Sequence, residues 1–184
     1  MATKAGYAAI TGKPNSGKST IMNLIIGTKL SIVTRKAQTT RKRVTGIYSD
    51  ENTQIIFVDT PGLIEPKYEL QKTMMKYVEE TLKDADVILL IIDATRFDTA
   101  EDFFSDTSVA ILNEAKQPKI AVLNKIDLLT DVRQVLPKIG ELDKMNLFGE
   151  IIPVSAKKNS GIDKIVEAIA RYLPEHDFSM SRIT

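Results

Sequence analysis

Residues 12–19 read Gly12-Lys13-Pro14-Asn15-Ser16-Gly17-Lys18-Ser19. They match the pattern G-x-x-x-x-G-K-[ST], in which glycines allow a tight turn and backbone N–H groups surround a phosphate chain. The preceding residues, 8–10, are apolar and strand-like, and residues 20–26 are helical in pattern and are closed by Gly27. A strand that turns into a helix aims the positive end of the helix dipole at one point. This context predicts a site for the phosphates of a nucleoside triphosphate rather than a glycine-rich turn without a ligand.

The side chains of this loop have distinct expected uses. Lys18 can reach the β- and γ-phosphates, and the Ser19 hydroxyl can ligate Mg²⁺. Gly12 and Gly17 allow the tight turn. The residues expected to contact the nucleotide are Gly12, Lys13, Pro14, Asn15, Ser16, Gly17, Lys18, Ser19 and Thr20.

The composition is typical of one soluble globular domain. The chain has 184 residues, of which 43% are hydrophobic and 27% charged, and its net charge of +1 does not by itself demand a nucleic-acid partner. The absence of cysteine excludes disulfides and cysteine-ligated metals. The first six residues have no apolar signal core, and the longest clean apolar run, 87–92, is too short to cross a bilayer. We therefore expect a cytoplasmic protein.

Strand-like and helix-like segments alternate along the chain. The predicted strands are Tyr7–Thr11, Arg43–Ser49, Gln54–Asp59, Val87–Asp93, Lys119–Asn124 and Glu150–Val154. A turn signal at residues 50–52 predicts that the second and third strands are antiparallel. The predicted helices are Lys18–Ile26, Leu70–Lys83, Ala100–Ala115, Asp131–Leu142 and Ile162–Tyr172. This order predicts an α/β fold: a six-stranded, mixed but mainly parallel sheet with helices on both faces, whose ligands lie beyond the carboxyl ends of the strands.

A second motif follows the third predicted strand. Asp59 can hold Mg²⁺ through water, and the N–H of Gly62 can meet the γ-phosphate because glycine permits close backbone approach. Alone, D-x-x-G also describes a plain turn, but its place at the end of a strand favours a phosphate and metal site. The residues expected to contact the nucleotide here are Asp59, Thr60, Pro61, Gly62 and Leu63.

A third motif, Asn124-Lys125-Ile126-Asp127, follows the fifth predicted strand. Guanine presents N1–H and its 2-amino group as adjacent donors that one carboxylate can accept, and Asp127 suits that pairing. Adenine would leave the carboxylate unpaired, which costs about 1–3 kcal/mol or more. Asn124 can tie this loop to the phosphate loop, and the stem of Lys125 can cover the base. After the next strand, the segment expected to supply an N–H to the guanine oxygen is Ser155, Ala156 and Lys157.

In this order the motifs resemble those of a small GTPase of the P-loop NTPase class, and the resemblance covers essentially the whole chain. Residues 36–41, Lys-Ala-Gln-Thr-Thr-Arg, resemble the first switch of the Era family of bacterial GTPases, and the phosphate loop and residues 59–63 agree with that. The resemblance implies a GTPase domain over residues 1–174 with GTP or GDP as ligand. It implies Mg²⁺ held by Ser19, Thr40 and Asp59. In this family the threonine matching Thr40 closes over the metal and the γ-phosphate; Thr39 is the alternative.

Hydrolysis would depend on positioning and charge stabilisation. The residues expected to act in it are Lys18, Thr40, Gly62 and Asn15. Many small GTPases orient the attacking water with a glutamine directly after D-x-x-G, where this chain has Leu63, so we expect slow intrinsic turnover. In related GTPases an asparagine at the position of Asn15 helps bind K⁺, and we hypothesise the same here. Arg41 and Arg43 are a less favoured source of positive charge.

The resemblance also extends to partners. It implies action in assembly of the small ribosomal subunit and maturation of its RNA, peripheral membrane association in the full-length family, and a monomer. Era normally carries a C-terminal RNA-binding KH domain, and residues 175–184 resemble the start of the linker to it. We therefore expect the GTPase half of a longer protein, which places RNA binding by this polypeptide in question.

Other interpretations stay open. Leu63 is compatible with a GTP-binding module that does not hydrolyse. Another GTPase of the TrmE-Era-EngA type, acting in large-subunit assembly or tRNA modification, is a second alternative, which residues 36–41 disfavour. A basic cluster surrounds the first switch and consists of Arg35, Lys36, Arg41, Lys42 and Arg43. It is either a contact for ribosomal RNA or a solvated loop entering an edge strand. Asp93 is expected to be a turn or cap residue, and the phenylalanines at 97, 103 and 104 are expected to be packing residues.

Overall fold

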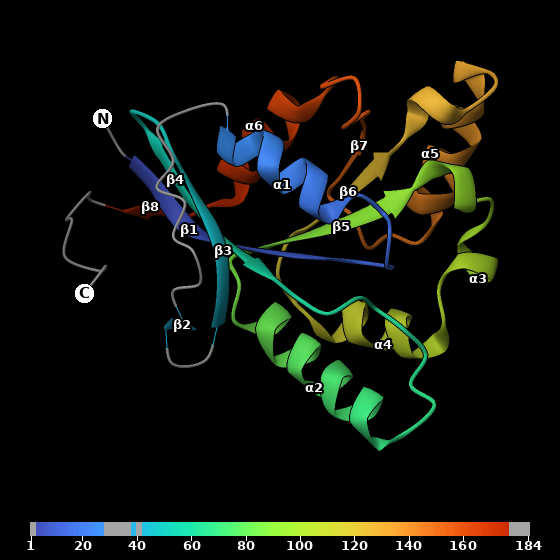
Figure 1. The fold of residues 1–184 in the computed structure, drawn as a ribbon, viewed down its shortest axis with the longest axis horizontal. Coiled ribbons are helices and arrows are strands. Elements are labelled where there is room, and N and C mark those ends of the chain that lie inside the picture. The colour runs from blue at the N-terminus through green and yellow to red at the C-terminus, as the bar shows by residue number, and fades with distance from the viewer. Residues whose placement is uncertain (1–2, 28–37, 40–41, 177–184) are drawn as a thin grey trace.

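A computed structural model describes residues 3–27, 38–39 and 42–176 (Figure 1). One sheet runs through this part of the chain in the order β2-β3-β4-β1-β5-β6-β7, and β8 pairs with β1. Its strands are β1 (Thr3–Gly12), β2 (Gln38–Thr39), β3 (Lys42–Ser49), β4 (Thr53–Asp59), β5 (Val87–Asp93), β6 (Lys119–Asn124), β7 (Glu150–Pro153) and β8 (Glu175–His176). The six predicted strands are confirmed, and the sheet has two further strands, β2 and β8, of two residues each.

The sheet is mixed and mainly parallel, as predicted. β4, β1, β5, β6 and β7 pair in parallel, whereas β3 is antiparallel to β4 across the turn at residues 50–52. The Asp50 carboxylate closes that turn by accepting the N–H groups of Asn52 and Thr53. β5 is buried at every residue because helices cover both of its faces, which explains its unbroken aliphatic sequence.

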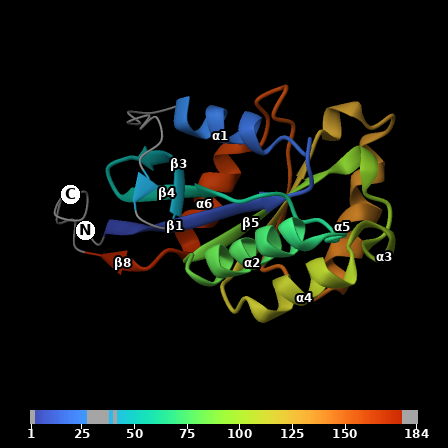
Figure 2. The ribbon, with the colours of Figure 1, turned by 60° about the horizontal axis from the view of Figure 1, so that its bottom comes forward.

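Helices cover both faces of the sheet (Figure 2). α1 and α6 contribute to one apolar core, and α2, α4 and α5 contribute to the other. The helices are α1 (Lys18–Gly27), α2 (Glu69–Lys83), α3 (Ala100–Phe103), α4 (Asp106–Glu114), α5 (Val135–Lys144) and α6 (Ile162–Tyr172), with short 3₁₀ turns η1 (Ala94–Arg96), η2 (Ile126–Leu128) and η3 (Val132–Gln134). Among the described residues, no helix has the length and apolarity needed to span a membrane.

The prediction of one continuous helix over residues 100–115 is wrong. The chain forms α3, leaves the helical conformation at Phe104, and begins α4 after Ser105, whose hydroxyl accepts the N–H of Ser108. A serine cap competes with helix continuation because its side chain satisfies a free N–H of the next helix. The break places Phe103 and Phe104 in edge-to-face contact with each other and with Phe97, which confirms the packing role expected for these rings. Similarly, the start of the predicted helix at 131 is the 3₁₀ turn η3, and α5 follows it.

Candidate nucleotide-binding site

The turn after β1 has a backbone that glycine alone can form at two positions. Gly12 and Gly17 have φ of 147° and 101°. A Cβ on Gly12 would lie 2.3 Å from the carbonyl oxygen of Ile91, and one on Gly17 would lie 2.1 Å from Nδ2 of Asn124. Asn15, between them, adopts the left-handed conformation with φ of 63°. The predicted phosphate loop is therefore a tight, crowded turn that leads into α1.

Lys18 lies across this loop at the start of α1. Its ammonium donates to the carbonyl oxygens of Lys13 and Gly12 at 3.2 and 3.4 Å. Burial lowers the pKa of Lys18, and the negative charge of Asp59 opposes that shift. A half-buried ammonium held by two long carbonyl bonds is suited to exchange them for the stronger, charged acceptors of a phosphate chain.

The segment after β4 packs directly on the phosphate loop. Thr60 donates its N–H and its hydroxyl to the carbonyl of Ile10 at 3.1 and 3.0 Å, and the N–H of Leu63 donates to the carbonyl of Gly12 at 3.2 Å. A Cβ on Gly62 would lie 2.9 Å from that same Gly12 oxygen. The two predicted phosphate motifs are thus in contact.

Leu63 is buried in the apolar core beneath this segment, with only 3% of its surface exposed. The core that receives it also contains Phe97 and Phe103. A buried aliphatic side chain can neither donate to nor accept from a water molecule. That Leu63 does not orient the attacking water stays a prediction.

Asn124 joins three loops at the carboxyl edge of the sheet. Its buried amide donates to the carbonyl of Ser16 at 3.0 Å and accepts the N–H of Ala156 at 3.0 Å. The expected link between the Asn124 loop and the phosphate loop is therefore present, and the same amide also fixes the Ser155–Lys157 segment.

The carboxylate predicted to recognise guanine is held from the neighbouring loop. Oδ1 of Asp127 accepts the hydroxyl of Ser155 at 2.6 Å, and that hydroxyl in turn accepts the N–H of Lys158 at 3.1 Å. Asp127 is half-buried, and Lys157 is exposed. A carboxylate oriented in this way has lost rotational freedom before any base arrives, which reduces the entropic cost of recognition.

Asp93 does more at this edge than the turn or cap role predicted from the sequence. Asp93 caps η1 through the N–H of Thr95, as expected, but its Oδ2 also lies 2.6 Å from the ammonium of Lys125. Burial favours the neutral acid, yet the bonds from Lys125 and Thr95 outweigh it and lower the pKa of Asp93. The sequence did contain a signal for this wider role. Asp93 ends β5, and β5 lies between β1 and β6, the strands that lead into the phosphate loop and the Asn124 motif.

Lys13, the other lysine of the loop, contacts an aromatic ring. Its ammonium lies 3.9 Å from the centroid of the Phe103 ring, a cation–π contact. Burial lowers the pKa of Lys13. The contact links the phosphate loop to α3.

The predicted metal ligands are partly described. Ser19 is exposed in the first turn of α1, and Asp59 ends β4 close enough to Lys18 to affect its pKa. A hydroxyl and a carboxylate at one edge are hard oxygen donors of the kind that Mg²⁺ prefers. Thr40 lies outside the described residues, as do Arg35, Lys36 and Arg41 of the basic cluster. Within the described ranges, no group of three or more His, Cys, Asp or Glu side chains forms a metal cluster.

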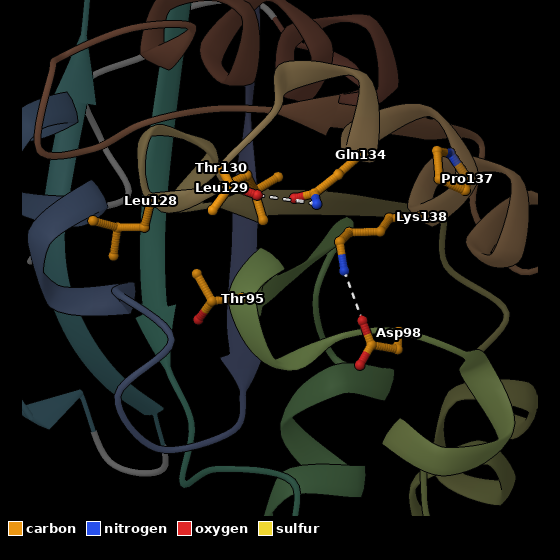
Figure 3. A pocket seen from close by; sticks show the side chains of 8 residues that line it. All are labelled: Thr95, Asp98, Leu128, Leu129, Thr130, Gln134, Pro137 and Lys138. Atoms are coloured by element: carbon orange, nitrogen blue, oxygen red, sulfur yellow. Dashed lines mark hydrogen bonds and ion pairs between the residues drawn. The ribbon is translucent and has the colours of Figure 1, made fainter.

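An open pocket of about 460 Å³ lies beside η1, η2 and α5 (Figure 3). An ion pair of 3.0 Å between Lys138 and Asp98 crosses its wall. Its lining residues are Thr95, Asp98, Leu128, Leu129, Thr130, Gln134, Pro137 and Lys138. None of them belongs to the predicted nucleotide site.

Comparisons with known proteins identify the family of this chain. A sequence model described as 50S ribosome-binding GTPase matches residues 7–125, which include the first two motifs and the first two residues of the third. The chain belongs to this GTPase family. Within it, the chain is similar to GTPase Era of Aquifex aeolicus, with 44% identity over 176 residues that cover 94% of this chain and 58% of that protein. The expected resemblance to the Era GTPases is confirmed.

Solved structures support the same relationship within the family. Era in complex with MgGDPNP and nucleotides 1506–1542 of 16S ribosomal RNA matches with 41% identity and a TM-score of 0.76, over 99% of this chain and 61% of that one. A variant of Aquifex aeolicus Era bound to GDP and AlF₄⁻ matches with 42% identity and a TM-score of 0.75, over 99% and 62%. The P-loop GTPase fold is thereby confirmed. The chain spans about three fifths of the length of these relatives.

Proposed function

We propose that this chain binds GTP and GDP at the carboxyl edge of the sheet and hydrolyses GTP as the switch domain of an Era-type GTPase. The observation that carries the proposal is the Asn124 amide, which bonds the phosphate loop through Ser16 and the Ser155–Lys157 segment through Ala156. A single side chain thereby draws the predicted phosphate and guanine motifs to one place. The assigned contacts are the residues at 12–20, 59–63, 124, 125, 127 and 155–157.

Calorimetry with GDP, GTP and ATP tests the binding step. We expect GDP and GTP to bind and ATP to bind at least about a hundredfold more weakly. With adenine, the Asp127 carboxylate would lack the two guanine donors, which costs about 1–3 kcal/mol, and adenine also lacks the oxygen that the 155–157 segment would meet. Equal affinity for ATP and GTP would contradict the assignment of Asp127. Absence of binding by all three would contradict the nucleotide site as a whole.

We propose that hydrolysis relies on fixed charges around the phosphates. Lys18 and the N–H groups of the phosphate loop would face the developing negative charge, and Ser19, Thr40 and Asp59 would hold Mg²⁺. Bound there, Mg²⁺ would neutralise charge on the phosphate oxygens. Contacts from Thr40 and Gly62 to the γ-phosphate would be lost on hydrolysis, which would release both switch segments.

The K⁺ hypothesis concerns Asn15. Asn15 lies in the phosphate loop with a left-handed backbone conformation, and the residue is exposed. A K⁺ ion held there would supply positive charge in place of a water-orienting glutamine. Turnover at fixed ionic strength should be faster in KCl than in NaCl, and Asn15→Ala should remove the difference. Equal rates in the two salts would contradict the hypothesis.

A GTP-binding module without hydrolysis is the second candidate, and the burial of Leu63 favours it. A single-turnover assay with excess protein, Mg²⁺ and K⁺ separates the two functions. Release of phosphate in step with loss of GTP supports the enzyme. Stable GTP over many hours would support the binding module.

We propose that the wider role lies with the small ribosomal subunit. The support is the similarity to an Era structure that contains a segment of 16S ribosomal RNA. We also propose that residues 1–174 form the GTPase domain, that residues 175–184 begin a linker to a KH domain, and that the protein is a cytoplasmic monomer. Co-sedimentation with separated ribosomal subunits tests the partner, since the alternative GTPases of this class predict the large subunit or no ribosome.

A further inference from the structure

Asp93 is the buried acidic residue at the end of β5. Only 8% of its side chain is exposed. Oδ1 accepts both the N–H and the hydroxyl of Thr95, at 2.9 and 2.6 Å, so one face of the carboxylate is fixed to η1. Oδ2 is left to face Lys125, whose ammonium lies 2.6 Å away.

The same ammonium reaches the phosphate loop. Nζ of Lys125 donates to the carbonyl oxygen of Asn15 at 2.6 Å. Lys125 and Asn15 both adopt left-handed backbones, with φ of 66° and 63°. Such conformations cost a non-glycine residue about 1–2 kcal/mol and persist only where surrounding contacts hold them.

A fixed anion beside the ammonium makes this bridge much more favourable. Its side chain has four rotatable bonds and loses about 2 kcal/mol of rotamer entropy when it is immobilised. One neutral carbonyl compensates little for withdrawing an ammonium from water, whereas a buried carboxylate does so through a charge-assisted bond. Asp93 is that carboxylate, and Thr95 keeps it in the orientation required.

We infer that Asp93 is a positioning residue for the nucleotide site: it fixes the Lys125 ammonium on the Asn15 carbonyl and so holds the phosphate loop in the shape that receives the nucleotide. The inference rests on the proposed nucleotide binding. Because the bridge acts on the loop backbone rather than on the γ-phosphate, it serves GDP and GTP equally. Its loss should raise KM for GTP and leave kcat nearly unchanged.

The decisive experiment is a double-mutant cycle on the full chain. Asp93→Asn keeps an oxygen for Thr95 and removes the charge that holds Lys125. We expect it to raise Kd for fluorescent GDP and GTP analogues by about tenfold each, with kcat at saturating GTP within about threefold of the unsubstituted value. In a Lys125→Ala background, Asp93→Asn should add less than about twofold, since the bridge is already gone.

Asp98→Asn is the matched control. Asp98 lies five residues further along the chain and also pairs with a lysine, Lys138, but its side chain is 86% exposed and Lys138 lies in α5, not in the three loops. It should leave both affinities within about twofold. The melting temperature of the nucleotide-free protein is recorded for every variant, so that measurements are made on folded chains.

Three results would overturn the inference. Asp93→Asn could lower the melting temperature while leaving nucleotide affinity unchanged, which would make it a purely structural residue. Its effect could persist in full in the Lys125→Ala background, or it could change GTP affinity without changing GDP affinity. Failure of the unsubstituted protein to bind either nucleotide is a different outcome, because it would overturn the proposed function on which the inference depends.

Discussion

The side chain of Asn124 bonds the backbone of Ser16, 108 positions earlier in the chain, at 3.0 Å. Both partners lie in the interior, where an unmet polar group is costly. This bond connects the loop after β6 to the loop after β1, and the bond that Asn124 accepts from Ala156 extends the connection to the loop after β7.

Asn124→Ala should weaken GDP and GTP binding together by about tenfold or more, because it leaves the Ser16 carbonyl and the Ala156 N–H unpaired at about 1–3 kcal/mol each. The free energy of unfolding should fall by a similar amount. Calorimetry and urea denaturation measure the two effects. Asn113→Ala, at an exposed position near the end of α4, should change neither. Unchanged binding in Asn124→Ala would mean that the three loops assemble independently.

Gly17→Ala should abolish detectable nucleotide binding. The added Cβ would lie 2.1 Å from Nδ2 of Asn124, and φ of 101° is strained for alanine. Binding of a fluorescent GDP analogue measures the loss. Gly140→Ala is the control, since a Cβ at that helical position meets no atom within 4 Å, and it should stabilise the fold by about 0.5–1 kcal/mol. Tight binding of the GDP analogue by Gly17→Ala would contradict this prediction, because it would show that the loop can shift to accommodate the added Cβ.

Asp127→Asn should move nucleotide preference from GTP toward xanthosine triphosphate. Xanthine presents an oxygen at C2 where guanine presents an amino group, and the new amide can donate to it. Competition between the two nucleotides measures the change. Ser155→Ala, which removes the hydroxyl that orients Asp127, should weaken GTP binding by a few fold without altering the preference. Retained GTP affinity in Asp127→Asn would refute the guanine contact.

Tyr48 should make the fold less stable at high pH. Burial, the hydrogen bond to Asp50 and the negative charge of Asp50 raise the pKa of Tyr48 to about 12. The native state therefore keeps a proton that the unfolded chain releases near pH 10, so stability falls as pH rises from about 10 to 12. Tyr48→Phe should lower stability at pH 8 by about 1 kcal/mol and flatten the decline above pH 10. Parallel pH slopes in the two proteins, measured by chemical denaturation, would contradict this account.

Much of the fold could be predicted because its signals are local. The aliphatic run of β5, the glycines at 12 and 17 and the turn at 50–52 each constrain the backbone within a few residues. The error over residues 100–115 has a local cause as well: helical spacing continues across Phe104 and masks the Ser105 cap that divides α3 from α4.

The amino-acid sequence by itself determined the α/β class, the order of strands and motifs along the chain, and which three loops are expected to contact the nucleotide, because periodicity and turn chemistry act between near neighbours. Only the tertiary structure decided that Leu63 is buried, that Lys13 lies over Phe103 and that Asp93 pairs with Lys125. These contacts join residues that are distant in sequence, and they exist because parallel pairing places β1, β5 and β6 side by side with their carboxyl ends at one edge. The orientation of each of these side chains depends on the hydrogen-bonding, charged or aromatic groups on the neighbouring strands and on the segments that follow them.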